Sequence, residues 1–190
     1  FSTIEQLKNH LVYLTLYFQG EPFLHPDFFE MVKYARKNNI YVATSTNAHF
    51  LTEKNAELTV KSGLNRLVIS LDGIDNETYK TYRKGGNFNT VLQGIRNLCN
   101  AKKQMNVSHP FVILQFIVFA TNEHQIDDIK RIGKELGVDE VQIKTAQIYD
   151  YENGNPLIPE NQKYSRYKKL NDGKYIIKKK IKNQCKRMWQ

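Results

Sequence analysis

The chain has 190 residues, of which 41% are hydrophobic and 25% are charged, the composition of an ordinary globular protein. No apolar run is long enough to span a bilayer, which argues against an integral membrane protein. The two cysteines, Cys99 and Cys185, lie far apart in the sequence, so nothing implies a secreted disulfide framework and a reducing, cytoplasmic setting is expected.

The net charge of +9 is concentrated in one segment. Residues 161–190 hold eleven Lys or Arg and one acid, Asp172, so they carry +10 and the rest of the chain carries −1. Such a tail is typical of a solvated, partly helical connector, or of a segment that binds an acidic partner. No recognisable nucleic-acid motif accompanies it, so nucleic acid is not an expected partner.

In chain order, helical periodicity alternates with runs that are rich in β-branched residues. A short helix in residues 1–11 leads into the first strand. The predicted strands are 12–18, 41–45, 66–71, 111–119 and 141–145. Apolar residues at helical spacing separate them, with Asp27 and Thr52 placed to cap two helices and Gly137 placed to end another. After Ile148 the alternation stops, and residues 149–159 predict a loop.

Parallel strands joined by helices form either an open doubly wound sheet or a (β/α) barrel, and periodicity does not choose between them. Both architectures bind ligands at the carboxyl ends of the strands. The residues just past each strand are therefore the candidates for function.

These strand ends carry complementary polar groups. Gly20 and Glu21 supply open backbone and a carboxylate for an amine. Thr46 and Asn47 can hydrogen-bond a ribose or an amino-acid group, and Ser70 and Asp72 follow the third strand. Arg83 can take a carboxylate in a bidentate manner. A zwitterionic nucleoside such as S-adenosylmethionine needs this set of partners. His25 and His49 also lie in loops at this edge.

Three stretches resemble the radical S-adenosylmethionine (radical SAM) superfamily in order and spacing. Residues 14–28 (LTLYFQGEPFLHPDF) resemble its GGEP strand and loop, with Gln19 in place of the first glycine. Residues 44–51 (TSTNAHFL) resemble its T-N-G strand end, with Ala48 in place of glycine. Residues 67–88 (LVISLDGIDNETYKTYRKGGNF) resemble its S-x-D-G…Y-x-x-x-R-x-G-G-x-F stretch.

The resemblance implies an α/β fold, a partial (β/α)6 barrel over residues 1–148 with five parallel strands and the first barrel strand missing. It implies that Gly20 and Glu21 hold the methionyl amine of S-adenosylmethionine, and that Arg83 meets the carboxylate. Thr46, Asn47 and Ser70 would lie near the ribose or methionine part. Gln115 and Asn122 would complete the site near ribose or adenine, and Asp72 would be a ligand or a structural residue.

The family's chemistry depends on a four-iron, four-sulfur cluster held by a C-x-x-x-C-x-x-C loop, which with an electron donor cleaves S-adenosylmethionine to a 5′-deoxyadenosyl radical that abstracts hydrogen. This sequence has no such loop. The resemblance therefore implies a chain truncated at both ends and inactive by itself, from an enzyme acting on a peptide, protein or cofactor precursor.

Residues 149–190 would be a linker and basic helical tail. Gln184 to Trp189 (QCKRMW) resembles the start of a SPASM or twitch extension, so Cys185 would ligate an auxiliary iron–sulfur cluster in the full-length protein. Cys99 fits a small core residue.

Two other functions remain open from the sequence. The first is a non-catalytic α/β binding module whose basic tail contacts an acidic partner. The second is an unrelated barrel enzyme for a phosphorylated substrate, against which the absence of a Gly-rich phosphate loop counts.

Overall fold

The structure is a computed structural model, and it describes residues 1–178. Its elements follow one another in the order α1 (Ser2–Leu7), β1 (Tyr13–Thr15), η1 (Pro22–Leu24), α2 (Phe28–Lys37), β2 (Tyr41–Thr46), α3 (Glu53–Lys61), β3 (Arg66–Ser70), α4 (Asn76–Tyr82), α5 (Phe88–Gln104), β4 (Phe111–Val118), η2 (Glu123–Gln125), α6 (Ile126–Leu136), β5 (Glu140–Thr145), β6 (Tyr167–Lys169) and β7 (Tyr175–Ile177).

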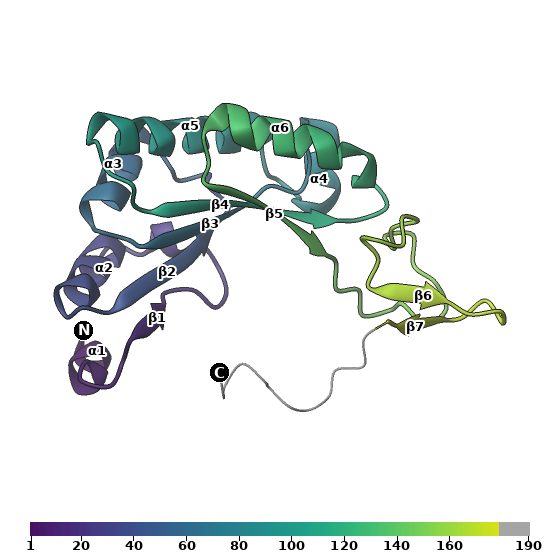
Figure 1. The fold of residues 1–190 in the computed structure, drawn as a ribbon, viewed down its shortest axis with the longest axis horizontal. Helices are drawn as coiled ribbons and strands as arrows, with labels where there is room; N and C mark the ends of the chain where they lie inside the picture. Colours follow the sequence, from purple (N-terminus) through teal and green to yellow (C-terminus); the bar gives the residue numbers. More distant parts are fainter. Residues whose placement is uncertain (179–190) are drawn as a thin grey trace.

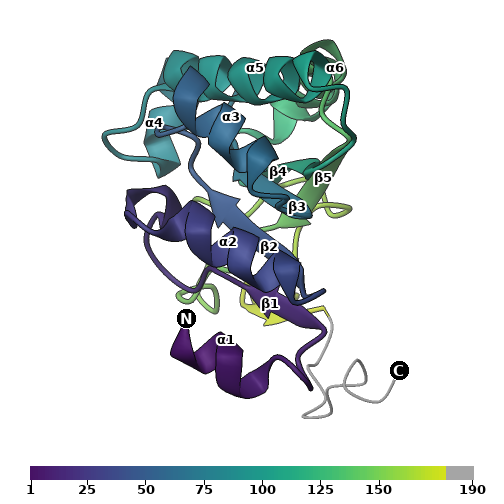
Figure 2. The same cartoon turned by 90° about the vertical axis from the view of Figure 1, so that its left-hand side faces the viewer.

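The first five strands form one parallel sheet in the sequential order β1-β2-β3-β4-β5. A doubly wound sheet would reverse its strand order part-way, so the sequential order decides for the barrel type that the sequence left open. Right-handed crossovers then place the intervening helices on one face. Figures 1 and 2 show α2 to α6 along this face, which confirms the predicted partial barrel with five parallel strands.

Side chains alternate between the two faces of the sheet. On β3, Leu67 and Ile69 are fully buried against the helices, whereas Arg66 and Val68 point to the open face. On β4, Leu114 has no exposed surface and belongs to the main hydrophobic core. The open face therefore carries the residues of opposite parity, and several of them are polar.

The strand that the sequence predicts over 12–18 is shorter in the structure, where β1 covers Tyr13–Thr15. β1 is an edge strand that pairs with β2 alone, so its ends lack a second partner. The predicted helix ends hold better: Thr52 accepts a hydrogen bond from the Asn55 amide and Gly137 ends α6 at a φ of 75°. Asp27 precedes α2 without a side-chain cap.

The predicted helix in the basic tail does not form within the described residues of that tail, 149–178. Instead β6 and β7 make a two-stranded antiparallel sheet, in which Leu170 donates to the Lys174 carbonyl around Gly173 at a φ of 86°. An Asp172-Gly173 turn followed by alternating half-buried and exposed residues is a hairpin signal that the Lys content obscured.

The hairpin packs on a second, smaller hydrophobic cluster beyond the end of β5. Phe119, Ala146, Ile148, Ile158 and Tyr167 form this cluster, and each is less than 9% exposed. No helix among residues 1–178 has the length and apolarity needed to cross a membrane.

Candidate functional site

The Glu21 carboxylate joins the ends of β1 and β2. Its Oε1 accepts hydrogen bonds from the Thr46 hydroxyl at 2.8 Å and the Phe23 amide at 3.2 Å, and its Oε2 accepts one from the Asn47 amide at 2.8 Å. A carboxylate offers about four acceptor positions, so about one remains on Oε2. The sequence predicted Glu21, Thr46 and Asn47 separately, and the structure brings them together.

Gly20 precedes this carboxylate in the left-handed region, with a φ of 83°, and a Cβ there would meet no atom within 4 Å. The glycine is therefore needed for its backbone conformation and not for space. Ala48 has a φ of 62°. Its position is the one where the T-N-G pattern has glycine, so the family's preference has a backbone cause.

His49 connects the β2 end to the start of α5. Its Nδ1 lies 3.1 Å from the Asn47 carbonyl oxygen, and its Nε2 accepts the Asn87 amide at 2.9 Å. A ring that accepts at Nε2 donates from Nδ1, which fixes the neutral tautomer. His49 thus ties the loop after β2 to the residue that precedes α5.

Asp72 makes hydrogen bonds with both Arg83 and Asn122. The Asp72 side chain is fully buried; its Oδ2 accepts from Arg83 Nε at 2.7 Å and its Oδ1 from the Ile117 amide at 2.9 Å. Asn122 Nδ2 donates to the Asp72 carbonyl at 3.0 Å and to the Ile117 carbonyl at 2.9 Å. Burial raises the pKa of the Asp72 carboxyl, and the nearby Arg83 guanidinium offsets part of this rise.

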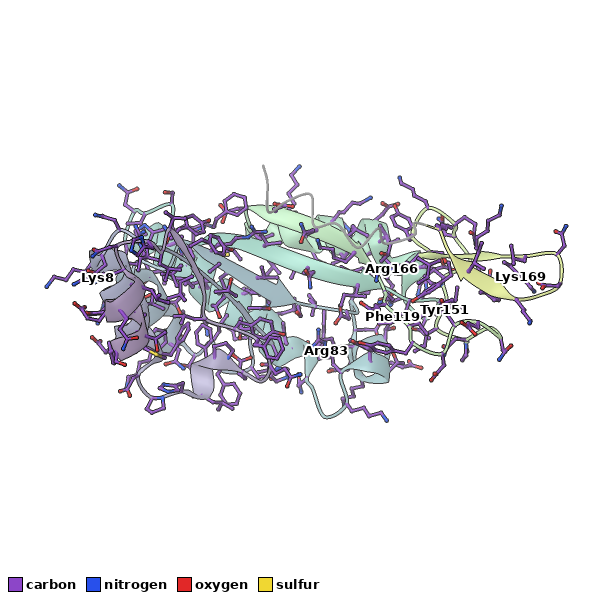
Figure 3. The ribbon with its side chains drawn as sticks, turned by 90° about the horizontal axis from the view of Figure 1, so that it is seen from below. Lys8, Arg83, Phe119, Tyr151, Arg166 and Lys169 are labelled. Carbon is purple, nitrogen blue, oxygen red and sulfur yellow. The ribbon has the colours of Figure 1, made fainter. Side chains whose placement is uncertain are left out.

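Ser70, Arg83 and Gln115 line one cavity of about 510 Å³ on the open face of the sheet. Ser70 and Gln115 are direct neighbours in the β3–β4 register. Figure 3 looks onto the molecule from this side, with Arg83 near the carboxyl ends of the strands. The cavity therefore collects three of the predicted residues at the edge where ligands of this architecture bind.

Sequence reasoning missed three residues here. Tyr17 and Tyr82 also line the cavity. Tyr17 shares the parity of Tyr13 and Thr15, so alternation could have indicated it. Gln125 is 3% exposed and braces the loop after β3, accepting from the Ile74 amide at 3.1 Å. No local pattern marks a residue whose role depends on a partner 51 positions away.

The comparisons with known proteins agree with this geometry. The family model described as "Radical SAM superfamily" matches residues 2–131, more than half of the chain. The chain belongs to the radical SAM superfamily.

Several curated relatives match part of the chain. It is 30% identical over 118 residues to a probable GTP 3',8-cyclase of Methanocaldococcus jannaschii, covering 62% of this chain and 38% of the relative. It is 34% identical over 119 residues to the AdoMet-dependent heme synthase of Methanosarcina barkeri, covering 62% and 32%. It is 27% identical over 134 residues to the mycofactocin maturase MftC of Mycobacterium tuberculosis, covering 70% and 33%. The chain thus spans about a third of these relatives' lengths.

Solved structures share the fold. SuiB of Streptococcus suis bound to S-adenosylmethionine superimposes with a TM-score of 0.61 at 16% identity, over 78% of this chain and 33% of SuiB. The protein anSMEcpe with bound AdoMet gives 0.59 at 20% identity, over 86% and 45%.

Of the two cofactors of the radical SAM superfamily, S-adenosylmethionine fits these residues and the four-iron, four-sulfur cluster does not. The open acceptor position on Glu21 and the cavity polar groups suit the amine and hydroxyls of S-adenosylmethionine. The cluster does not fit: residues 1–178 contain no group of three or more His, Cys, Asp or Glu that could hold a metal. Cys99 is buried and donates to the Gly137 carbonyl at 3.7 Å, and Cys185 lies outside the described residues.

Proposed function

We propose that residues 1–148 are the S-adenosylmethionine-binding part of a radical SAM enzyme. The observation that carries this proposal is the Glu21 carboxylate, which three donors fix at the end of β1 while an acceptor position remains open. An ammonium group takes such a position through a charge-assisted hydrogen bond. The Ser70–Gln115 pair supplies hydrogen-bonding groups for the ribose in the neighbouring cavity.

Arg83 serves the methionyl carboxylate in this proposal, but Asp72 already occupies part of its guanidinium. Nε donates to Asp72, and Nη2 lies 2.7 Å from the same oxygen. A guanidinium has five N–H groups, so Arg83 retains donors for a second carboxylate. Asp72 and Asn122 then act by holding Arg83 and the loop after β4, and Gln115 is the member of the later strands that faces the ligand.

The activity proposed for the full-length protein is the family's: reductive cleavage of S-adenosylmethionine and hydrogen abstraction from a peptide, protein or cofactor precursor. The similarity to a mycofactocin maturase and to SuiB, which has been solved bound to its precursor peptide, supports a substrate of this class. Because no C-x-x-x-C-x-x-C loop occurs in the 190 residues, no cluster-dependent step is assigned to a residue of this chain.

The tail and the setting are further parts of the proposal. Residues 149–190 would lead into a SPASM or twitch extension, with Cys185 as an auxiliary-cluster ligand. The free, buried Cys99 thiol supports a reducing, cytoplasmic location.

Backbone amide NMR of the protein tests the binding proposal. Titration with S-adenosylmethionine should shift the amides of Gly20, Thr46 and Asn47, and Glu21→Gln should weaken binding about tenfold, because the ammonium loses a charged acceptor. Glu30→Gln is the matched control, since Glu30 is exposed and pairs with Lys33 on the surface of α2. Shifts confined to other regions, or equal affinity of the two variants, would overturn the proposal.

The coding sequence upstream of Phe1 separates this proposal from the binding-module alternative. A C-x-x-x-C-x-x-C loop after an apolar strand supports the radical enzyme. An upstream sequence without this loop favours the non-catalytic module with a basic, partner-binding tail.

A further inference from the structure

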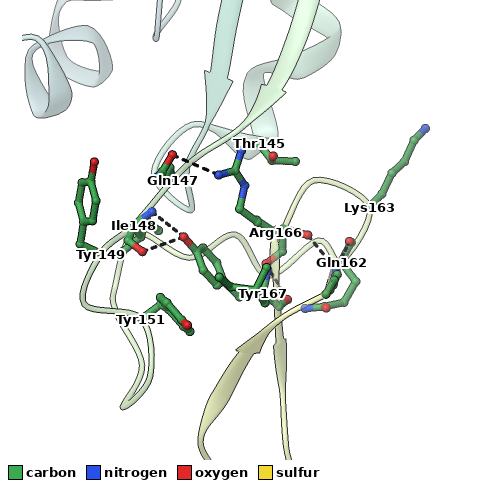
Figure 4. Close-up of a pocket in the computed structure, with 12 residues that line it drawn as sticks. Thr145, Gln147, Ile148, Tyr149, Tyr151, Gln162, Lys163, Arg166 and Tyr167 are labelled. Atoms are coloured by element: carbon green, nitrogen blue, oxygen red, sulfur yellow. Dashed lines mark hydrogen bonds between the residues drawn. The ribbon is translucent and has the colours of Figure 1, made fainter. Parts of the chain in front are cut away.

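A second cavity, of about 670 Å³, lies between the end of β5 and the β6–β7 hairpin. Figure 4 shows it with Tyr149 and Tyr151 on one side, Arg166 and Tyr167 in the middle, and Lys163 on the other side with its side chain extending away from Arg166. None of the residues proposed above for S-adenosylmethionine lines it. Its size suits a small ligand or a few peptide side chains.

The cavity is cationic and holds no carboxylate. Arg166, Lys163 and Lys178 are its charged lining residues. Lys178 Nζ donates to the carbonyl oxygens of Gln162 and Ser165, and Lys163 Nζ lies over the Tyr164 ring at 5.4 Å. Arg166 Nη1 donates to Gln147 Oε1 at 3.4 Å, so the hydrogen-bond partner of Arg166 found within residues 1–178 is neutral. The sequence from 173 to 190 contains no Asp or Glu, so side chains of the remaining tail cannot neutralise them. An anion is the missing partner.

The opposite wall of this cavity is aromatic. The rings of Tyr151 and Tyr167 stack with centroids 4.6 Å apart, and Tyr149 is 83% exposed at the rim. The Tyr167 hydroxyl is committed to the main chain of Ile148 and the residue is 1% exposed, so Tyr149 and Tyr151 form the accessible part of this wall. The cavity therefore combines an anion site with a surface for apolar or aromatic groups.

Aromatic contacts and a shared buried cluster lead from the candidate S-adenosylmethionine site to the cavity. Arg83 lies over the Tyr82 ring at 5.3 Å, and Tyr82 contacts Phe119 with centroids 4.5 Å apart. Phe119 belongs to the same buried cluster as Tyr167. Figure 3 shows Phe119 and Tyr151 between Arg83 and Lys169 of the hairpin. A ligand held here lies beyond the carboxyl ends of the strands.

We propose that this cavity binds an acidic peptide segment, with an Asp or Glu carboxylate on Arg166 and a neighbouring apolar side chain against Tyr149 and Tyr151. Within residues 1–178 the cavity places one guanidinium, that of Arg166, beside Tyr149 and Tyr151, an arrangement that suits a single anionic group next to an apolar side chain. The planar Arg166 fork matches a carboxylate. That this peptide is the enzyme's substrate rests on the proposed function; the peptide site itself does not.

Fluorescence anisotropy tests the site, with a labelled Gly-Glu-Phe-Glu-Gly peptide and its Gln-for-Glu counterpart. Arg166→Gln should weaken binding of the Glu peptide about tenfold, because a charge-assisted pair is lost. Lys174→Gln is the matched control: it removes the same charge from the same hairpin but does not line the cavity. Circular dichroism melting of both variants verifies that the hairpin change leaves the fold intact.

Several outcomes would overturn the inference. These are equal binding of the Gln peptide, equal loss in the two variants, or displacement of the Glu peptide by inorganic phosphate or an oligonucleotide at lower concentration than by free glutamate. Weakened S-adenosylmethionine binding in Arg166→Gln would instead assign the cavity to the cofactor, and so also overturn it. The Glu21→Gln variant distinguishes the peptide site from the proposed S-adenosylmethionine site. It should lose S-adenosylmethionine binding and keep its affinity for the peptide.

Discussion

Arg83 and Asp72 form an ion pair that fixes the loop after β3: Nε and Nη2 of Arg83 both lie 2.7 Å from Asp72 Oδ2. The Asp72 side chain has no exposed surface, and that of Arg83 is 29% exposed. The aspartate of the S-x-D-G stretch therefore orients the arginine eleven residues later. A buried carboxylate that is paired at one oxygen and bonded to a backbone amide at the other is a positioning group for the arginine beside it.

Removing one partner of this pair should destabilise the fold. In Asp72→Asn the partly buried Arg83 guanidinium loses its counter-charge, so we expect the free energy of unfolding to fall by about 3 kcal/mol. Urea denaturation followed by circular dichroism measures the change. Asp128→Asn is the control, since Asp128 pairs with Arg131 on the exposed face of α6 and its loss should leave the midpoint unchanged. Equal midpoints for the two variants would show that the buried pair contributes little.

Gly94→Ala reverses an ordinary helix rule. Alanine in a helix interior usually stabilises by about 1 kcal/mol relative to glycine. In α5, however, a Cβ at position 94 would lie 2.6 Å from the Ala48 carbonyl oxygen and 2.9 Å from Leu51 Cβ. We therefore expect a loss of about 1–3 kcal/mol from this overpacking. Thermal unfolding measures it, with exposed Arg96→Ala on the same helix as control. A stabilised Gly94→Ala would contradict the close packing of α5 on the loop after β2.

The helices and strands were predictable where burial of a face imposes a regular pattern of apolar residues on the sequence. β4 is apolar at nearly every residue because one of its faces packs on the helices and the other is also largely buried. On that second face, which belongs to the open side of the sheet, Ile113 is only 1% exposed. The hairpin was not predicted, since its Lys-rich strands bury few residues and are held by a cluster from Phe119 to Ile158. Strand order also required three dimensions, because local periodicity carries no information on neighbours.

The candidate site was predictable as a set of strand ends but not as a network. Glu21 and Thr46 each follow a strand, yet nothing in either motif indicates that the hydroxyl donates to the carboxylate at 2.8 Å. The Asp72–Arg83 pair likewise depends on how α4 packs after β3. Residues separated by many positions acquire partners through packing, which a single sequence does not encode locally.

The Cys99 thiol should be unreactive in the folded protein. Burial raises its pKa, and the side chain is 4% exposed. In a Cys185→Ser background, iodoacetamide alkylation of Cys99 at pH 8 should be at least about tenfold slower than in urea, because alkylation needs an accessible thiolate. Mass spectrometry of the labelled peptide measures the rate. Equal folded and unfolded rates would show that α5 exposes this thiol.

The same pKa shift gives a sign for stability. A thiol whose pKa is raised on folding binds its proton more tightly in the native state. Its contribution is fully present below the unfolded pKa of about 8.5 and is lost as pH rises through the folded value. Unfolding free energies from pH 7 to 10 should therefore fall more in the Cys185→Ser protein than in the Cys99→Ser, Cys185→Ser double variant. Parallel pH profiles would contradict the shift.

Tyr167→Phe should loosen the junction between β5 and the hairpin. The buried Tyr167 hydroxyl accepts from the Ile148 amide at 2.6 Å and donates to the Ile148 carbonyl at 2.8 Å, so its removal leaves two main-chain groups without that partner. Each unsatisfied buried group costs about 1–3 kcal/mol, while the stacked ring remains on Tyr151. Hydrogen exchange of the Ile148 amide should accelerate more than tenfold, whereas the Leu114 amide in the centre of the sheet should keep its protection. Tyr175→Phe on the facing strand, whose hydroxyl makes no hydrogen bond to another group of residues 1–178, controls for loss of a tyrosine hydroxyl. Unchanged exchange at Ile148 would mean that the hydroxyl is not what holds the chain as it leaves β5, and the cavity beside it would then lack a fixed wall.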